Sequence, residues 1–261
     1  MKKALFVALL VLFAVAGSAA AREITLTATQ DACLYMAQPT TNNGTGGRMD
    51  VRGGQDGVLI QFNLDGELAA GEVITAAKLH LPYWSKVSED FVAYNLLAPW
   101  QEGVGNSGSV GGTLFPWGPA SVGDASWTFQ ASTAVRAGIA SDPLGNTDAF
   151  IGVMVGSEGV LWNTPGGRGI GTDVGVKLLD VVAWTGADMD LDPAGVTVLN
   201  GWADGTVDNY GLNLWSNNGG LTKLKTIESG AGPSLVLTIV PEPMTIALLG
   251  IGGLALIRRR K

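Results

Sequence analysis

Short apolar and β-branched runs, separated by clusters of turn-forming residues, set the strongest limit on how this chain folds. No long stretch shows helical periodicity, and the clusters between the runs are rich in Gly, Asn, Asp and Ser. The runs are residues 23–29, 58–64, 77–83, 91–97, 150–155, 211–215 and 235–240. Strand-length runs bounded by turn signals predict an all-β fold, a jelly-roll-like β-sandwich.

Two of these runs differ in their patterning. In residues 58–64, Ile60, Phe62 and Leu64 alternate with a more polar set, which predicts one core face. Residues 234–239 alternate less cleanly, which indicates a strand that is partly covered on both sides.

One short helix is expected after Asp192. This residue is a suitable N-cap, Pro193 suits the first helical position, and Gly205 supplies a stop. The apolar residues on one face are Val196, Leu199 and Trp202.

The first 21 residues have the parts of a secretory signal peptide. Lys2 and Lys3 precede an apolar segment (residues 4–16), and three alanines (19–21) form an A-x-A cleavage site. Export by the Sec route and cleavage by signal peptidase are therefore expected.

The C-terminal 21 residues form a second distinct segment. Pro241, Glu242 and Pro243 end the last strand, because proline offers no N–H to a ladder. An uncharged run of 14 residues (244–257) follows, and a basic cluster closes the chain: Arg258, Arg259, Arg260 and Lys261. As a hydrophobic helix the run reaches only about 21 Å, short for a bilayer core of about 30 Å. A tail anchor and a buried C-terminal helix are the simpler interpretations.

This order of parts resembles the PEP-CTERM sorting signal of Gram-negative bacteria. The resemblance covers residues 240–261. It implies transient insertion in the inner membrane, processing at the PEP motif by an exosortase-type protease, and delivery to the outer surface or extracellular matrix. It also implies an association with exopolysaccharide.

Residues 22–240 resemble the DNRLRE family of secreted β-sandwich domains, some of which are similar to carbohydrate-binding modules. The matching fragments are Asp31-Ala32, Tyr35, Pro39 to Gly44, Leu59 to Leu64, Gly71 to Leu79, Trp100 to Gly103, Val198 to Gly205, Asn209 to Trp215, Ile227 to Ser229 and Pro233 to Leu237. The chain departs from the family in its basic signature, since Arg48 and Arg52 precede the strand containing Gln61. Residues 105–188 are also more divergent.

Charge and cysteine content exclude some functions. Residues 22–240 contain 10 basic and 22 acidic residues, a net charge of about −12, which disfavours nucleic acid as a partner. Cys33 is the single cysteine, so no intramolecular disulfide forms, and it is expected to be a small buried residue of the first strand. His80 is the single histidine and is expected on a strand.

No catalytic residues are assigned. Glu102 is the most attractive acid for acid–base hydrolysis, and a turn residue after an aromatic anchor is the simpler interpretation. The acidic stretch 188–192 fails as an EF-hand-like loop, because Pro193 and Leu199 stand where glycine and glutamate are needed. No cofactor or metal ligand is assigned, although Ca²⁺ bound by loop oxygens stays open.

Aromatic recognition is the remaining chemistry. Trp84, Trp117 and Trp162 lie beside turn-forming residues and are candidates for stacking on sugar rings. Packing roles are expected for Trp100, Trp127, Trp202 and Trp215.

Together these features predict an exported, non-catalytic cell-surface or extracellular-matrix protein associated with exopolysaccharide. The alternatives are a polysaccharide-active hydrolase or lyase and an accessory carbohydrate-binding module.

Overall fold

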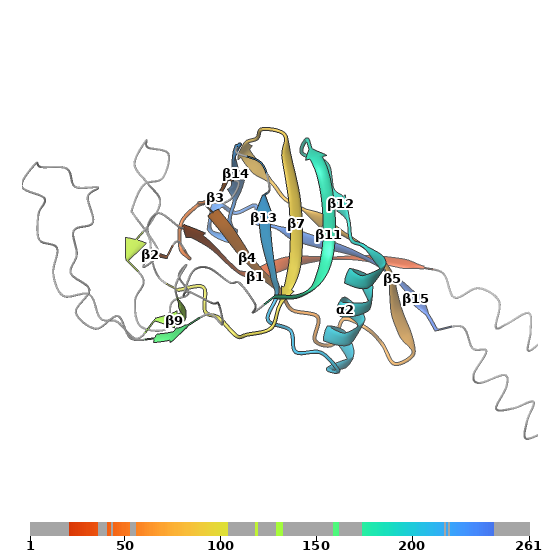
Figure 1. The fold of residues 1–261 in the computed structure, drawn as a ribbon. Helices are drawn as coiled ribbons and strands as arrows, with labels where there is room; N and C mark the ends of the chain where they lie inside the picture. Colours follow the sequence, from red (N-terminus) through yellow and green to blue (C-terminus); the bar gives the residue numbers. More distant parts are fainter. Residues whose placement is uncertain are drawn as a thin grey trace, which may run out of the picture.

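An eight-stranded antiparallel sheet forms the body of the protein (Figure 1). The computed structural model describes residues 21–35, 41–42, 44–52, 56–103, 118–119, 129–132, 159–161, 174–216, 218 and 220–242. In spatial order the strands are β11 (Val174–Trp184), β7 (Glu89–Leu96), β13 (Leu212–Ser216), β4 (Asp56–Phe62), β1 (Arg22–Tyr35), β15 (Ser234–Pro241), β5 (Glu72–His80) and β12 (Met189–Asp190).

The long strand β1 belongs to both layers of the fold. Its first half pairs with β15, from Arg22↔Ile239 onward, and its second half pairs with β4 as far as Tyr35↔Asp56. The pairing register shifts between Ala28 and Gln30, an irregularity of the kind that bends a strand. The sheet therefore turns at β1 and folds back on itself, and the predicted all-β sandwich is confirmed as a nearly closed one.

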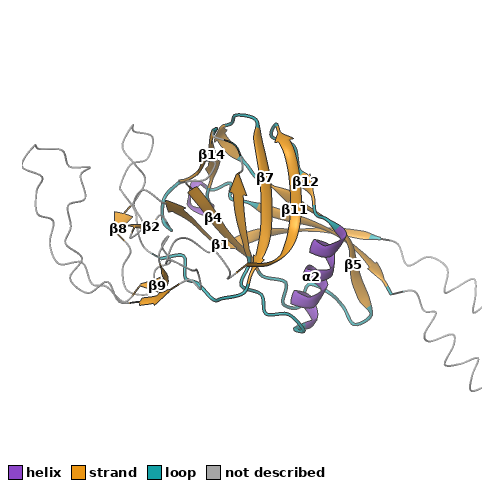
Figure 2. Ribbon diagram, in the orientation of Figure 1, coloured by secondary structure: helices purple, strands orange, loops and turns teal. Residues whose placement is uncertain are grey.

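The single α-helix of the described residues, α2 (Pro193–Asp204), lies across the opening between β11 and β5 (Figure 2). Before the helix, the Asp192 N–H donates to the Leu178 carbonyl of β11. Within it, the Asn200 amide exchanges two 2.9 Å hydrogen bonds with the backbone of Ile74 on β5. The helix thus bridges the edges of the two layers.

The predicted helix is confirmed at both ends. It begins after Asp192, and Gly205 ends it with a φ of 75°, a left-handed conformation that suits glycine. The side chain of Asp192 makes no capping hydrogen bond, so its expected role as a side-chain cap is wrong. Leu199 and Trp202 are buried as predicted, and Val196 is partly buried against the core.

Strand β4 is buried on both faces. Ile60 and Phe62 enter the main core between the layers, together with Phe91 and Leu237. Leu59, on the opposite face, enters a second apolar cluster formed with Ala32, Leu34, Leu96, Ala98 and Trp100. The predicted core face of Ile60, Phe62 and Leu64 is therefore confirmed, and the second cluster covers Leu59 on the other face. Strand β15, central between β1 and β5, is covered on both sides as predicted.

Smaller sheets complete the described structure. A three-stranded sheet has the order β3 (Arg48–Arg52), β14 (Leu221–Lys225), β6 (Tyr83–Ser85), and the 3₁₀ helix η1 (Ile227–Ser229) follows β14. Two strand pairs are β2 (Thr41–Asn42) with β8 (Gly118–Pro119), and β9 (Phe129–Ser132) with β10 (Gly159–Leu161). The strand predicted at 150–155 lies outside the described residues. No helix among the described residues is both long and apolar enough to span a membrane.

Candidate functional site

The start and the end of the β-sandwich lie side by side. Arg22 pairs with Ile239, and its guanidinium contacts the Glu72 carboxylate at 2.7 Å. The hydrogen bond from Arg22 lowers the pKa of Glu72 to about 2. Pro241 is the last residue of β15 and pairs with Glu72, and the Glu242 N–H donates to the Gly71 carbonyl.

The first two residues of the predicted PEP motif are thus held against β5, next to the predicted signal-peptidase junction. Several predicted features lie outside the described residues. These are the signal peptide before Ala21, Pro243, the apolar run that follows it, and the basic cluster of Arg258, Arg259, Arg260 and Lys261.

Three carboxylates from distant segments meet at another place on the fold. Asp31 lies in the second half of β1, Glu102 follows β7, and Glu228 lies in η1. One oxygen from each falls within 4.8 Å of the other two. Asp31 is fully buried, Glu102 is half-buried and Glu228 is exposed, so the cluster runs from the interior to the surface.

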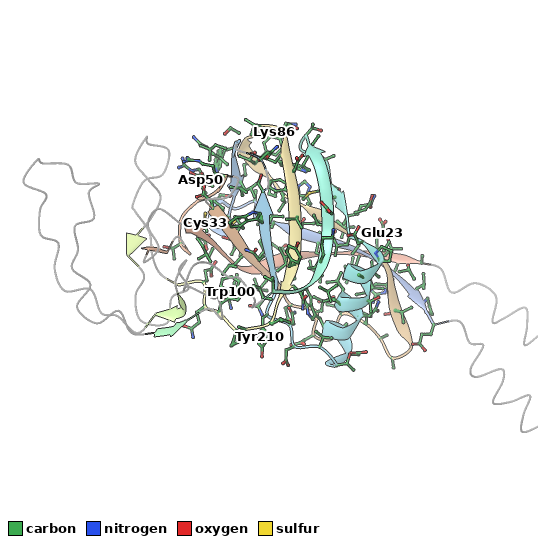
Figure 3. All side chains as sticks on the ribbon, in the orientation of Figure 1. Glu23, Cys33, Asp50, Lys86, Trp100 and Tyr210 are labelled. Carbon is green, nitrogen blue, oxygen red and sulfur yellow. The ribbon has the colours of Figure 1, made fainter. Side chains whose placement is uncertain are left out.

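Hydrogen bonds hold this cluster in place. The Asp31 N–H donates to Glu102 Oε1 at 2.9 Å, and the Ile227 N–H donates to Asp31 Oδ2 at 2.9 Å. The Glu102 N–H donates to Gln30 Oε1 at 3.3 Å. Two residues before Glu102, the Trp100 ring nitrogen donates to the Tyr210 carbonyl at 2.7 Å, as the neighbouring labels in Figure 3 indicate.

The carboxylate cluster is electrostatically unfavourable when fully ionised. Burial raises the pKa of Asp31 to about 8, and repulsion from Glu228 and Glu102 adds to this shift. Burial also raises the pKa of Glu102 to about 7, again with a contribution from Glu228. The cluster therefore retains protons near neutral pH or requires a compensating cation.

Sequence reasoning identified Glu102 and missed Asp31 and Glu228 as members of a site. All three acids lie in fragments that resemble the DNRLRE family: Asp31-Ala32, Trp100 to Gly103, and Ile227 to Ser229. Those fragments also contain Glu72 and Asp204, so the sequence alone does not single out the three acids that meet.

Cys33 and His80 have separate partners. The Cys33 thiol is buried and donates to the Asp50 carbonyl at 3.0 Å, and burial raises its pKa well above the ordinary value. His80 is exposed on β5, with Nδ1 2.7 Å from Asp188 Oδ1. The predicted locations of both residues are confirmed.

The acidic stretch 188–192 lies at β12 and the turns around it. Asp190 is exposed, as predicted, and lies 3.9 Å from the Lys78 ammonium of β5. Asp188 contacts His80, so two of the three acids in the stretch 188–192 have basic partners.

Trp84 is the most exposed large apolar residue among the described side chains, with 60% of its surface accessible. It lies in β6, where its ring nitrogen donates to the Gly47 carbonyl and the Lys225 ammonium lies 4.7 Å from its ring centroid. Trp117 and Trp162, the other two stacking candidates, lie outside the described residues. Of the four tryptophans predicted to pack, Trp100 and Trp202 are buried, Trp215 is partly buried, and Trp127 is outside the described part.

Basic side chains gather around Trp84. On the three-stranded sheet, Lys225 pairs with Arg48, and Lys223 with Asp50, so these side chains share one face. Asp50 is buried there and forms a 2.8 Å ion pair with Arg48. Arg52 lies on that face by strand alternation, while Met49, Val51 and Leu224 point into the core. Tyr83 pairs with Leu224 and contacts the Trp184 ring, so Tyr83 and Lys86, which lies 5.2 Å from the Tyr83 ring centroid, belong to the other side of β6.

We refer to Arg48, Arg52, Trp84, Lys223 and Lys225 as the basic aromatic face. It holds four of the ten basic residues between positions 22 and 240. Figure 3 shows Lys86 and Asp50 toward one end of the molecule, away from Glu23. Basic side chains are thus concentrated on one face of a protein whose net charge over this segment is about −12.

The protein is thus an antiparallel β-sandwich with two candidate sites, the basic aromatic face and the carboxylate cluster. No protein-family model and no curated protein matches the chain. The resemblances to the PEP-CTERM and DNRLRE families therefore rest on the residues given above.

Proposed function

We propose that this is an exported, non-catalytic cell-surface or extracellular-matrix protein that associates with exopolysaccharide, processed at its C-terminal tail by an exosortase-type protease. The basic aromatic face is the observation that carries the proposal. An exposed indole offers an apolar surface to the C–H faces of a sugar ring. Adjacent ammonium and guanidinium groups complement the carboxylates of an acidic glycan.

The charge distribution favours an acidic polysaccharide over a neutral one. The rest of the protein is acidic and repels a polyanion, so attachment is confined to the surface where positive charge is concentrated. Lys225 lies over the Trp84 ring, which places a cation beside the aromatic surface. A uronic acid residue has the ring and the carboxylate to engage both.

Native gel electrophoresis of the purified full chain, in gels containing alginate, polygalacturonate or a neutral β-glucan, tests this proposal. We expect retardation by the acidic polymers that weakens as salt increases. Trp84→Ala and Lys225→Gln should each weaken binding on the order of tenfold. Leu97→Ala, which removes another exposed apolar side chain, and Lys78→Gln are matched controls. Absence of retardation by every polymer refutes the proposal.

The carboxylate cluster favours a second candidate, a polysaccharide hydrolase or lyase. Carboxyl oxygens of Asp31 and Glu102 lie within 4.8 Å of each other and the pKa of Glu102 is about 7, and closely paired carboxyl groups with one raised pKa serve as the acid and base of glycosidases. Against it, Asp31 is fully buried and the Glu102 carboxylate is engaged by a backbone N–H. Turnover assays on polysaccharides decide the question: activity that Glu102→Gln abolishes supports the enzyme.

A further inference from the structure

The spacing of the carboxylate cluster matches a single metal ion. Calcium–oxygen distances are about 2.3–2.6 Å, so two ligands on one ion lie at most about 5 Å apart. One side-chain oxygen from each of Asp31, Glu102 and Glu228 lies within 4.8 Å of the others. One ion can therefore contact all three residues.

An unpaired buried oxygen also indicates a ligand at this place. The Asp31 side chain has no accessible surface, and only its Oδ2 has a hydrogen-bond donor, the Ile227 N–H. Its Oδ1 has no hydrogen-bond partner among the residues that the structure describes. A buried carboxylate oxygen without a partner is costly, and buried charges are normally paired or coordinate metals.

Compensating positive charge is not supplied by the described side chains. No ion pair between described residues includes Asp31 or Glu228. The charged groups that act on the Asp31 carboxylate, Glu228 and Glu102, are also acidic. A divalent cation removes this repulsion.

We propose that Asp31, Glu102 and Glu228 form a Ca²⁺-binding site that fastens β1, the segment after β7 and η1 to one another. The donors are hard carboxylate oxygens, which suit Ca²⁺ better than Zn²⁺, whose sites use nitrogen and sulfur. Three carboxylates supply up to six oxygens, within the six to eight that Ca²⁺ takes in flexible geometry. Exposed Glu228 places the entrance of the site at the surface.

The site is independent of glycan binding, because it shares no residue with the basic aromatic face. Trp84→Ala should lose glycan binding and keep the Ca²⁺ affinity of the parent, so the two proposals are tested separately.

Calcium titration of the full chain in mild detergent, after removal of metal with EGTA, tests the site. We expect one Ca²⁺ per chain by calorimetry and by metal analysis. Free Ca²⁺ at 100 times the Kd should raise Tm by roughly 5–10 °C. Mg²⁺ at the same concentration should have a much smaller effect, because it demands a stricter octahedral geometry.

Glu228→Gln is the decisive variant, because this residue is exposed and its replacement should leave the fold intact. It should weaken Ca²⁺ binding at least tenfold and reduce the Tm shift. Asp31→Asn should abolish binding, and circular dichroism establishes that the variant is folded. Glu23→Gln changes an exposed acid in the first half of β1, which pairs with β15, and this control should bind Ca²⁺ as the parent does. No bound Ca²⁺ at 10 mM (about ten times the Kd of the weakest extracellular calcium sites), or equal binding by Glu228→Gln and the parent, overturns the proposal.

Discussion

The backbone N–H of Asp31 donates to Glu102 Oε1, so a fully buried strand residue positions a carboxylate 71 residues further along the chain. The same residue accepts a hydrogen bond from the Ile227 N–H through its side chain. Asp31 therefore links β1 to two segments that meet it only in the folded protein. The fold therefore brings the carboxylates of Asp31, Glu102 and Glu228 together. Their mutual repulsion is present in the folded protein and absent from the unfolded chain.

Glu102→Gln should change stability in opposite directions with and without Ca²⁺. Glutamine keeps the side-chain oxygen that accepts from the Asp31 N–H and removes one negative charge from the cluster. In EGTA at pH 8 we expect the Tm to rise by about 2–4 °C, because repulsion falls. At saturating Ca²⁺ the variant should be less stable than the parent, because a ligand is weakened. A Tm change of the same sign in both conditions contradicts this prediction.

Asp56→Asn should stabilise the protein at alkaline pH. Both carboxylate oxygens of Asp56 are buried and have no hydrogen-bond partner within the described part of the chain. Burial raises its pKa to about 7, repulsion from Asp50 adds to the shift, and Arg52 opposes it. A raised pKa in the folded state means that the native protein binds this proton more tightly than the unfolded chain does. The stabilisation is full below the unfolded pKa of about 4 and is lost as pH rises through about 7.

Urea denaturation of Asp56→Asn at pH 4, 6 and 8 checks the prediction. The variant should be more stable than the parent by about 2–4 kcal/mol at pH 8, and by less than about 1 kcal/mol at pH 4. Asp65→Asn, which changes an exposed acid, is the control and should follow the parent at every pH. If the Asp56→Asn and parent stabilities run parallel from pH 4 to 8, the Asp56 carboxyl is not the titrating group.

The parts of the fold that the sequence predicts are those with a local signal. Strands β7 and β15 have continuous apolar or alternating character, and α2 has Pro193 at its start and Gly205 at its end. Strand β1 extends from the predicted 23–29 to Tyr35, because pairing with β4 overrides the polar interruption at Gln30 and Asp31. Pairing between strands that are distant in sequence gives no signal in a short stretch of the sequence.

Strands β3, β14 and β11 were missed for a related reason. In β14 every second residue is partly exposed, and Lys223 and Lys225 make the stretch resemble a loop. Strand β11 begins at Val174, next to Gly175, and glycine is a weak strand former. The carboxylate cluster was missed because Asp31, Glu102 and Glu228 are far apart in sequence and share no motif. Their meeting depends on the fold.

Gly211→Ala should be much more destabilising than Gly205→Ala. Both glycines have positive φ, 81° and 75°. A Cβ on Gly211 would collide with the Ile60 carbonyl and approach the Gln61 backbone, whereas a Cβ on Gly205 meets nothing within 4 Å. Alanine should cost about 1 kcal/mol at Gly205, from the left-handed conformation alone, and about 3 kcal/mol or more at Gly211. Denaturant titration gives the free energy of unfolding of each variant. The loss at Gly205 measures the cost of the left-handed conformation, and the additional loss at Gly211 measures the clash with β4. Equal losses in the two variants would show that the β4 backbone moves aside.

Cleavage at the PEP motif should release a β-sandwich that is as stable as the full chain. Strand β15 ends at Pro241, and Ile239 is its last fully buried side chain, so a chain ending within residues 241–243 retains every core contact of the strand. Intact-mass measurement of surface-released protein should give a C-terminus at Pro241, Glu242 or Pro243, and the Tm of this product should lie within about 1–2 °C of that of the full chain.

A variant truncated after Thr238 is the comparison. It loses Ile239 and the pairing beside Val73 and Glu72, and should be less stable by about 3 kcal/mol or more. Recovery of surface protein that ends only at Lys261 would identify the tail as a simple membrane anchor.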